Sequence, residues 1–171
     1  MAVPKLLCRG GGSGWAAVSA GSKPTVEFST SSSVITEIRP GEHVFGELNK
    51  TRLGSSTEDQ IALFVAGTVV SDRVPGQVIV DVGNKALSKE GSPEIGYGGI
   101  AGTKAVLAKP NEYHGFLPLP DGEFRPSVGT VVPVVPNHVC PVVLGFEELI
   151  VTDSAGTSLQ RWPVDARGFL N

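Results

Sequence analysis

The chain has 171 residues, of which 40% are hydrophobic and 18% charged, and its formal net charge is −3. This length and composition indicate one folded, soluble domain, and they exclude both a disordered chain and a complete (β/α)8 barrel, which needs about 250 residues. The balanced charge, without a long basic run, argues against nucleic-acid and membrane partners, and no stretch reaches the ~20 apolar residues of a transmembrane helix.

The N-terminal third of the chain is predicted to be irregular. Residues 8–33 are rich in glycine and serine, with one short strand expected at 15–19. A turn follows at Pro40-Gly41, and the polar segment 49–60 is typical of a loop. We therefore expect residues 1–60 to form an N-terminal remnant and linker, and residues 61–171 to form the main domain.

From residue 61 onward, short apolar segments alternate with turns containing glycine or proline. These segments cover residues 61–70, 77–82, 97–100, 104–108, 113–119, 130–135, 141–144, 149–151 and 160–164. Strands spaced by roughly 8–12 residues are typical of antiparallel sandwiches and barrels. The only helical feature that we expect is one turn within residues 85–89. The predicted fold class is therefore mostly β, an antiparallel β-barrel or sandwich that follows a small irregular N-terminal remnant.

Cysteine usage indicates the compartment. Cys8 and Cys140 lie far apart in different sequence contexts, which favours a reducing cytoplasm over a disulfide framework. The apolar patch near the N-terminus is broken by Arg9 and four glycines, so it does not have the pattern of a signal peptide.

The strongest chemical signal is the segment P-N-H-V-C-P at residues 136–141. In a strand, residues i and i+2 face the same side, so His138 and Cys140 would present an imidazole and a thiol together. Zn²⁺ prefers these two ligand types, and Pro141 favours an extended backbone at Cys140. The structural alternative is a small buried cysteine beside a histidine at the end of a strand, because two ligands alone do not make a metal site.

Six segments resemble the D-serine dehydratase and D-threonine aldolase family, in the family's order. They are S-A-G-S-K-P-T at 19–25, T-E-I-R-P-G-E-H-V-F at 36–45, A-G-T-V-V-S-D-R-V-P-G-Q-V-I-V-D-V-G-N-K-A-L-S at 66–88, N-E-Y-H-G at 111–115, P-V-V-P-N-H-V-C-P-V-V-L-G at 133–145 and Q-R-W-P-V-D-A-R-G at 160–168. Members are pyridoxal-phosphate lyases with an alanine-racemase-type fold. The resemblance implies that this chain is similar to their C-terminal β domain and lacks most of the N-terminal barrel.

The resemblance also implies roles for individual residues. His138 and Cys140 correspond to the family's metal ligands, and a cysteine at this position, where aldolases have an acid, points to zinc and to the dehydratase branch. Gly21, Ser22 and Thr25 fall in a loop near the cofactor phosphate in the family, although a Gly/Ser loop without that role is as compatible with the sequence. His114 corresponds to a histidine facing the active site; a surface histidine is the alternative.

Departures from the family concentrate on the cofactor side. Lys23, His43 and Glu47 replace a Thr, a Tyr and an Asp, and Tyr113 interrupts an E-E-H triplet. None of the seven lysines has the context of the family's Schiff-base lysine. Pyridoxal phosphate therefore lacks its covalent tether here, and we expect the chain to be inactive alone.

Three functions remain open at this point. The chain is either a domain of a zinc- and pyridoxal-phosphate-dependent lyase for D-3-hydroxy amino acids, a non-catalytic metal- or partner-binding β domain, or a relative of D-threonine aldolase. The D-amino acid substrate belongs only to the complete enzyme. A homo-oligomer or a separate barrel-bearing chain is the expected partner, and we expect the apolar segments 61–70 and 131–135 to form the contact surface.

Overall fold

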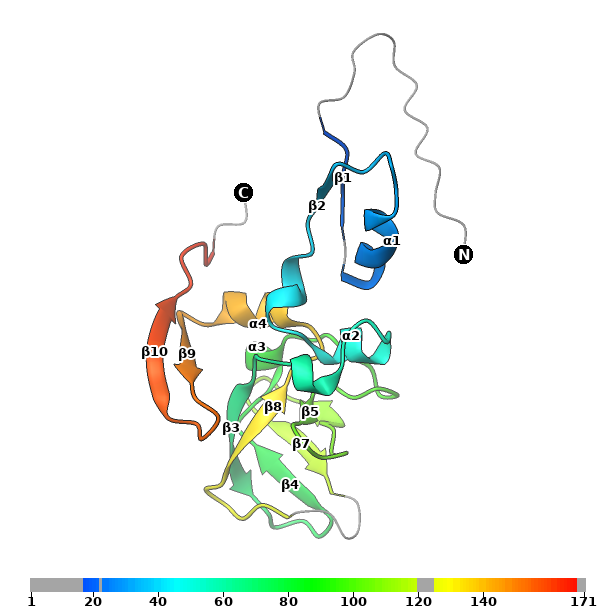
Figure 1. Cartoon of the computed structure of the whole chain (residues 1–171). Helices are drawn as coiled ribbons and strands as arrows, with labels where there is room; N and C mark the ends of the chain where they lie inside the picture. The colour runs from blue at the N-terminus through cyan, green and yellow to red at the C-terminus, as the bar shows by residue number, and fades with distance from the viewer. Residues whose placement is uncertain (1–16, 22, 120–124, 169–171) are drawn as a thin grey trace. The chain divides into compact units, whose positions relative to one another are not determined.

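The computed structural model describes residues 17–21, 23–119 and 125–168. The described residues form two compact units, one ending at Gly41 and the other beginning at Glu42 (Figure 1). Segment 42–60, which we grouped with the N-terminal remnant, belongs to the second unit by its contacts. The domain division at residue 60 itself stays a prediction.

The first unit is a small strand and helix arrangement. Its elements are β1 (Ser19–Ala20), η1 (Lys23–Thr25), α1 (Val26–Thr30) and β2 (Glu37–Ile38). Strands β1 and β2 pair in parallel, and the backbone N–H of Arg39 donates to the carbonyl of Ala20. A Cβ at Gly21 would lie 2.6 Å from the backbone nitrogen of Arg39, so this close approach requires glycine.

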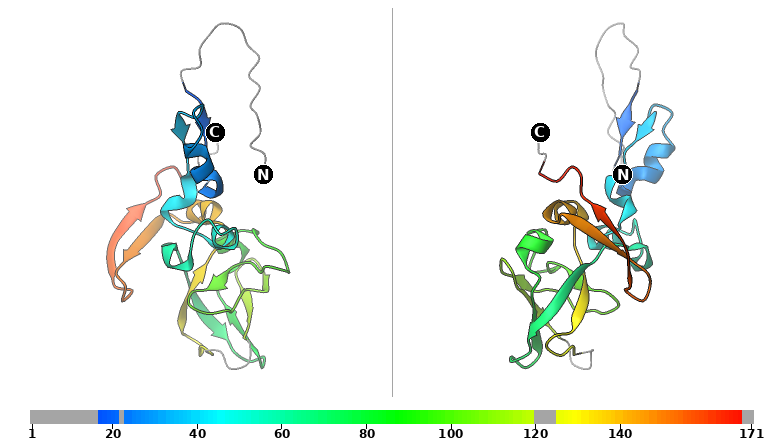
Figure 2. Two further views of the ribbon diagram at one scale, coloured as in Figure 1. Left: turned by 45° about the vertical axis from the view of Figure 1, so that its right-hand side comes forward. Right: turned by 90° about the vertical axis from the view of Figure 1, so that its left-hand side faces the viewer.

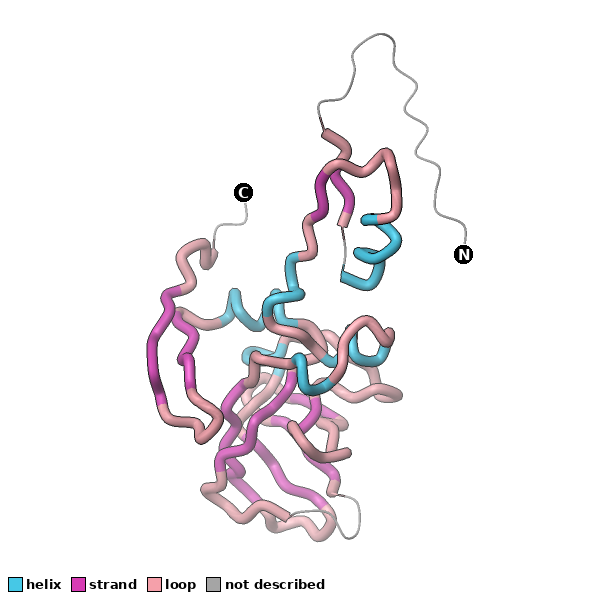
Figure 3. Tube along the Cα trace, viewed as in Figure 1, coloured by secondary structure: helices cyan, strands magenta, loops and turns pink. Residues whose placement is uncertain are grey.

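The second unit is built on one six-stranded sheet, drawn in magenta in Figure 3. Its strands are β3 (Val65–Ser71), β4 (Gln77–Val80), β5 (Gly99–Ile100), β6 (Lys109–Pro110), β7 (Gly115–Pro118) and β8 (Val131–Val135). Their spatial order is β5-β8-β3-β4-β7-β6, and every neighbouring pair is antiparallel. The sheet curls into a half-barrel, which Figure 2 shows from two further sides. The predicted mostly β, antiparallel fold class is therefore confirmed.

The core lies inside this curled sheet. Alternate residues of β3, Val65 and Val69, are buried, as are Val132 and Val134 of the neighbouring β8. This period of two is the expected pattern for a strand with one face toward the core. Side chains on the other face of these segments are exposed and include Phe64, Val70 and Val131. The expectation that segments 61–70 and 131–135 contribute a contact surface stays a prediction.

Three short α-helices and two 3-10 turns accompany the sheet. They are η2 (Gly41–Val44), α2 (Leu48–Arg52), η3 (Glu58–Gln60), α3 (Asn84–Leu87) and α4 (Val139–Gly145). The helical turn expected within 85–89 is confirmed as α3. The strand expected at 141–144 was wrong, because this segment belongs to α4. Val139 and Val142, three residues apart, are buried against the core, and Pro141 lies in the first helical turn, where the backbone N–H has no helical partner to lose.

The chain ends in a separate two-stranded sheet. Strands β9 (Glu148–Thr152) and β10 (Ser158–Pro163) form an antiparallel hairpin, as expected from segments 149–151 and 160–164. Every residue of β10 is exposed. Among the helices of the described residues, none has the length and apolar character needed to cross a membrane.

A substitution at Gly115 tests the close packing where β7 lies between β4 and β6. A Cβ at Gly115 would lie 2.3 Å from Cδ2 of Leu107 and 2.6 Å from the carbonyl oxygen of Val82. We expect Gly115→Ala to lower the free energy of unfolding by about 1–3 kcal/mol, measured by urea denaturation. Gly145→Ala is the matched control, since its nearest neighbour would be the carbonyl oxygen of Lys85 at 3.6 Å. Equal stabilities for the two variants would contradict this packing.

Candidate functional site

The segment with the predicted metal ligands leads from β8 into α4. His138 is the N-cap residue of α4 and has an extended backbone, with φ −141° and ψ 124°. Cys140 is the second residue of the helix. The two residues are therefore not partners along one strand, and that part of the prediction was wrong. They lie instead at the beginning of one helix.

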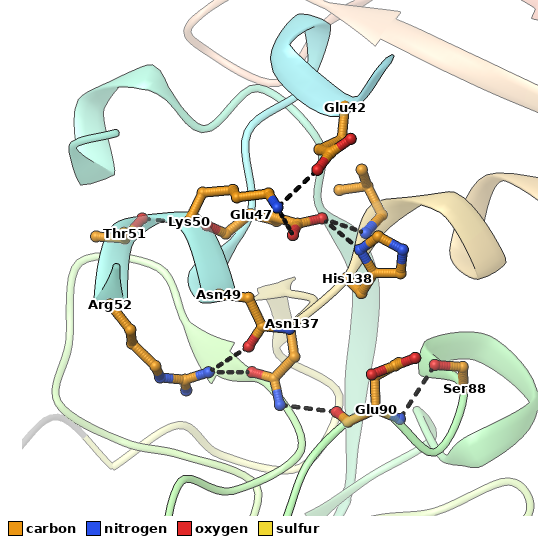
Figure 4. A network of polar contacts seen from close by, with 11 residues as sticks. Glu42, Glu47, Asn49, Lys50, Thr51, Arg52, Ser88, Glu90, Asn137 and His138 are labelled. Atoms are coloured by element: carbon orange, nitrogen blue, oxygen red, sulfur yellow. Dashed lines mark hydrogen bonds and ion pairs between the residues drawn. The ribbon is translucent and has the colours of Figure 1, made fainter. Parts of the chain in front are cut away.

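A buried carboxylate organises this helix start, as Figure 4 shows. Glu47 precedes α2 and is 1% exposed. Its Oε2 lies 2.8 Å from Nδ1 of His138 and accepts the backbone N–H of Val139 at 2.9 Å. One carboxylate oxygen therefore contacts the imidazole and also satisfies an N–H group at the N-terminus of α4, which has no helical partner.

A lysine compensates the negative charge of this region. Nζ of Lys50 lies 2.7 Å from Oε1 of Glu42 and 3.9 Å from Oε1 of Glu47. The hydrogen bond from Lys50 lowers the pKa of Glu42 below its usual value. Since all three side chains are largely buried, this charge pairing permits two acids to lie beside the histidine.

Asn137 fixes the backbone immediately before His138. Its side chain is buried, and Nδ2 donates to the carbonyl oxygens of Glu90 and Gly96 at 2.8 and 2.9 Å. Its Oδ1 accepts a hydrogen bond from Arg52 at 2.8 Å, and Arg52 also donates to the carbonyl of Ile95. Burial lowers the pKa of Arg52. This network ties the segment with the predicted metal ligands to α2 and to the loop at 90–96.

Backbone hydrogen bonds reinforce the same connection. The N–H groups of Leu48 and Asn49, in the first turn of α2, donate to the carbonyls of Pro136 and Asn137, both at 3.2 Å. The first N–H groups of a helix have no partner within it, so α2 meets this requirement through the segment before His138. Glu47, adjacent to Leu48, is thereby held against His138 by main-chain contacts as well.

An open cavity of about 460 Å³ lies beside these groups. Its lining residues are Glu47, Asn49, Lys50, Arg52, Leu53, Glu90 and His138. The His138 side chain is 29% exposed, so a ligand can approach the imidazole from solvent.

The Cys140 thiol is exposed and responds to the same charges. Its pKa is raised, first by partial desolvation and then by the negative charges of Glu42 and Glu47, with Lys50 opposing them. The thiol therefore lies within electrostatic reach of the carboxylates that surround His138. At neutral pH it is protonated unless a cation displaces the proton.

Other predicted site residues lie elsewhere. His114 lines a separate pocket of about 250 Å³, together with residues of β3, β4 and β7. Gly21 and Thr25 belong to the first unit, and Ser22 lies outside the described residues. The structure assigns Gly21 a packing role. The predicted cofactor roles of Gly21, Ser22 and Thr25 and the predicted active-site role of His114 stay predictions.

The buried polar residues around His138 were not predicted as part of the site. Glu47 was noted only because it replaces a family Asp, while Asn137 was only quoted within the P-N-H-V-C-P segment. Lys50 and Arg52 carried no signal, since they lie in a stretch that is typical of a loop. Glu47 and His138 are 91 residues apart, and only the fold brings them together.

The donor set fits an open metal site with two protein ligands. With Nδ1 of His138 directed at Glu47, Nε2 is the ring nitrogen left for a metal, and the thiol of Cys140, two residues along the chain, is exposed. In the part of the chain that the structure describes, no cluster of three or more His, Cys, Asp or Glu side chains is arranged to hold a metal ion. A closed four-ligand site is therefore not what these residues form.

Comparisons with known proteins find relatives that match most of this chain. A D-threonine aldolase from an Arthrobacter species is 30% identical over 154 residues, which are 89% of this chain and 40% of the aldolase. An uncharacterized protein of Mycobacterium tuberculosis is 34% identical over 131 residues, which are 73% of this chain and 98% of that protein.

Solved structures show the same similarity in three dimensions. The D-threonine aldolase from Filomicrobium marinum superposes with a TM-score of 0.80 at 28% identity, over 91% of this chain and 42% of the aldolase. The D-threo-3-hydroxyaspartate dehydratase from Delftia sp. HT23 gives 0.73 at 29% identity, over 86% and 43%. A cysteine-to-alanine mutant of that dehydratase is known in a metal-free form.

This chain spans about two fifths of the length of the enzymes that it matches. Its residues 62–152, more than half of the chain, match a family described as the putative serine dehydratase domain. They include the sheet, the loop at 90–96, His138 and Cys140. The chain belongs to the putative serine dehydratase domain family.

Proposed function

We propose that this domain supplies the metal site of a lyase that acts on D-3-hydroxy amino acids, with His138 and Cys140 as the two protein ligands and zinc as the metal. The observation that carries the proposal is the fixed imidazole of His138. A buried carboxylate holds its Nδ1, the residue lines an open cavity, and a thiol follows two residues later.

The names of the relatives support the substrate class. D-threonine and D-threo-3-hydroxyaspartate, named in those relatives, are both D-amino acids with a hydroxyl group on the β carbon. The relatives include both aldolases and dehydratases, which break different bonds of such a substrate. The soft thiolate of Cys140 favours zinc over Mg²⁺ or Mn²⁺ and so favours the dehydratase type.

In this proposal, residues of the chain bind the metal and orient it, and the metal supplies the Lewis acidity. His138 would contribute Nε2 and Cys140 would contribute Sγ, and both must be deprotonated at the coordinating atom. Two protein ligands leave coordination positions open for water or substrate. When bound, zinc supplies Lewis acidity toward a hydroxyl group.

Pyridoxal phosphate and the barrel belong to the proposed complete enzyme. Gly21, Ser22 and Thr25 are the residues that we propose near the cofactor phosphate. The backbone of Arg39 occupies the space beside Gly21, so no room is left there for a phosphate group. We therefore give Gly21 no role in the reaction. The partner that would provide the barrel, either a second copy or a separate chain, stays a prediction.

Metal titration tests the proposal. We expect the metal-free protein to bind Zn²⁺ in isothermal titration calorimetry, and we expect both His138→Ala and Cys140→Ser to weaken binding by more than about tenfold, because each removes one of only two ligands. Cys140→Ser should reduce zinc affinity more than Mn²⁺ affinity, since a hydroxyl is a harder ligand than a thiolate.

His114→Ala is the matched control, because it removes an exposed histidine that lines a different pocket. Its zinc affinity should equal that of the parent protein. If the parent binds no zinc at millimolar metal, or if all four proteins bind equally, His138 and Cys140 have only a structural role.

The raised pKa of the Cys140 thiol gives a separate prediction. In a Cys8→Ser background, iodoacetamide should modify Cys140 more slowly at neutral pH than it modifies a free cysteine, because only the thiolate reacts. The rate should rise with a midpoint above the ordinary thiol pKa. Glu42→Gln, which removes one of the negative charges, should lower that midpoint. An unchanged midpoint in this variant would contradict the electrostatic contribution of Glu42.

A further inference from the structure

His138 has two ring nitrogens, and only one of them is open to a ligand. Nδ1 lies 2.8 Å from Oε2 of Glu47. An ionised carboxylate only accepts hydrogen bonds, so the proton of a neutral imidazole must be on Nδ1 in this contact. Nε2 then keeps its lone pair, which is the atom that a metal requires.

Two neighbours keep the Glu47 carboxylate in the accepting role. The backbone N–H of Val139 donates to the same Oε2 at 2.9 Å, and the ammonium of Lys50 lies 3.9 Å from Oε1. Both contacts direct a donor or a positive charge at the carboxylate oxygens. Glu47 is also 1% exposed, so water does not compete for these contacts.

The position of Glu47 is fixed independently of its side chain. The two residues that follow it, Leu48 and Asn49, donate backbone hydrogen bonds to the carbonyls of Pro136 and Asn137. The main chain of the acid is thereby tied to the two residues before His138. A rigid support of this kind is what a precise ligand geometry needs.

The same carboxylate acts on both proposed ligands. It contacts the ring of His138, and through the N–H of Val139 it fixes the residue between His138 and Cys140. A metal-binding histidine commonly donates its second N–H to such a carboxylate, which sets the tautomer and the direction of the ring.

We propose that Glu47 is a positioning residue for the proposed metal ligand His138: it holds this residue in the Nδ1–H tautomer and so leaves Nε2 for the metal. This inference rests on the proposed function, since it concerns one of the same two ligands.

Glu47→Gln is the decisive variant. The amide matches the carboxylate in shape but carries no charge. Since the Val139 N–H points at the same oxygen as Nδ1, the amide oxygen faces both donors and holds the Nδ1–H less strongly than the carboxylate does, which releases the imidazole toward the Nε2–H form. We expect zinc affinity to fall by about 10- to 100-fold, the usual cost of losing such a carboxylate partner. Glu148→Gln is the control: it removes a carboxylate that pairs with Arg161 on the hairpin of β9 and β10 and does not line the cavity beside His138, so its zinc affinity should stay within about threefold of the parent.

A second measurement reads the tautomer directly. Long-range ¹H–¹⁵N NMR spectra of the metal-free protein, recorded where the imidazole is neutral, should show Nδ1 protonated in the parent and in Glu47→Gln a shift toward the Nε2–H form. A merely structural role of Glu47 would change stability, monitored by circular dichroism, without moving the proton between the two nitrogens.

The outcomes separate this inference from the proposed function. If the parent binds zinc and Glu47→Gln binds equally well with the same tautomer, the inference is wrong and the metal site stands. If the parent binds no zinc, the proposed function fails, and the tautomer of the parent alone decides the role of Glu47. If Glu47→Gln does not fold, an Nε2–H tautomer in the parent overturns the inference and an Nδ1–H tautomer upholds it.

Discussion

The buried carboxylate of Glu47 is the contact on which the candidate site depends. It accepts a backbone hydrogen bond at the N-terminus of α4 and meets Nδ1 of His138 with the same oxygen. Burying a charge is unfavourable unless it is paired and hydrogen-bonded, and here Lys50 and the two donors meet that requirement. Because all of these partners are needed, α2 and α4 must meet in one arrangement, and the imidazole has one orientation.

The half-barrel sheet provides the rigid base for this contact. Strand β8 buries Val132, Val134 and Val135 in the core and leads directly into the segment before His138. Helix α4 then anchors itself through Val139 and Val142, which are buried in the same core. The ligand segment is therefore held from both sides by apolar packing, while Asn137 fixes its middle by three hydrogen bonds. Small shifts of the ligands are opposed by a close-packed interior.

The arrangement suits an open site completed by other groups. The cavity beside His138 is wide, and the only protein ligands that we propose are His138 and Cys140. The enzymes that match the chain are more than twice as long as the part that it covers. In the proposed enzyme, the two metal ligands lie on this domain and the cofactor lies on the barrel. The reaction would then depend on how this domain and the barrel are joined.

The sequence by itself determined the mostly antiparallel β fold, because apolar segments at short, regular spacing and glycine and proline turns are local features. The family followed from segments such as P-N-H-V-C-P, which keep their order along the chain. The apolar residues after Cys140 were predicted as a strand, but they belong to helix α4. The helix forms there because Val139 and Val142, three residues apart, both pack into the core. Only the tertiary structure decided that Glu47 meets His138, since a contact between residues 91 positions apart arises from chain topology and leaves no periodic trace in the sequence.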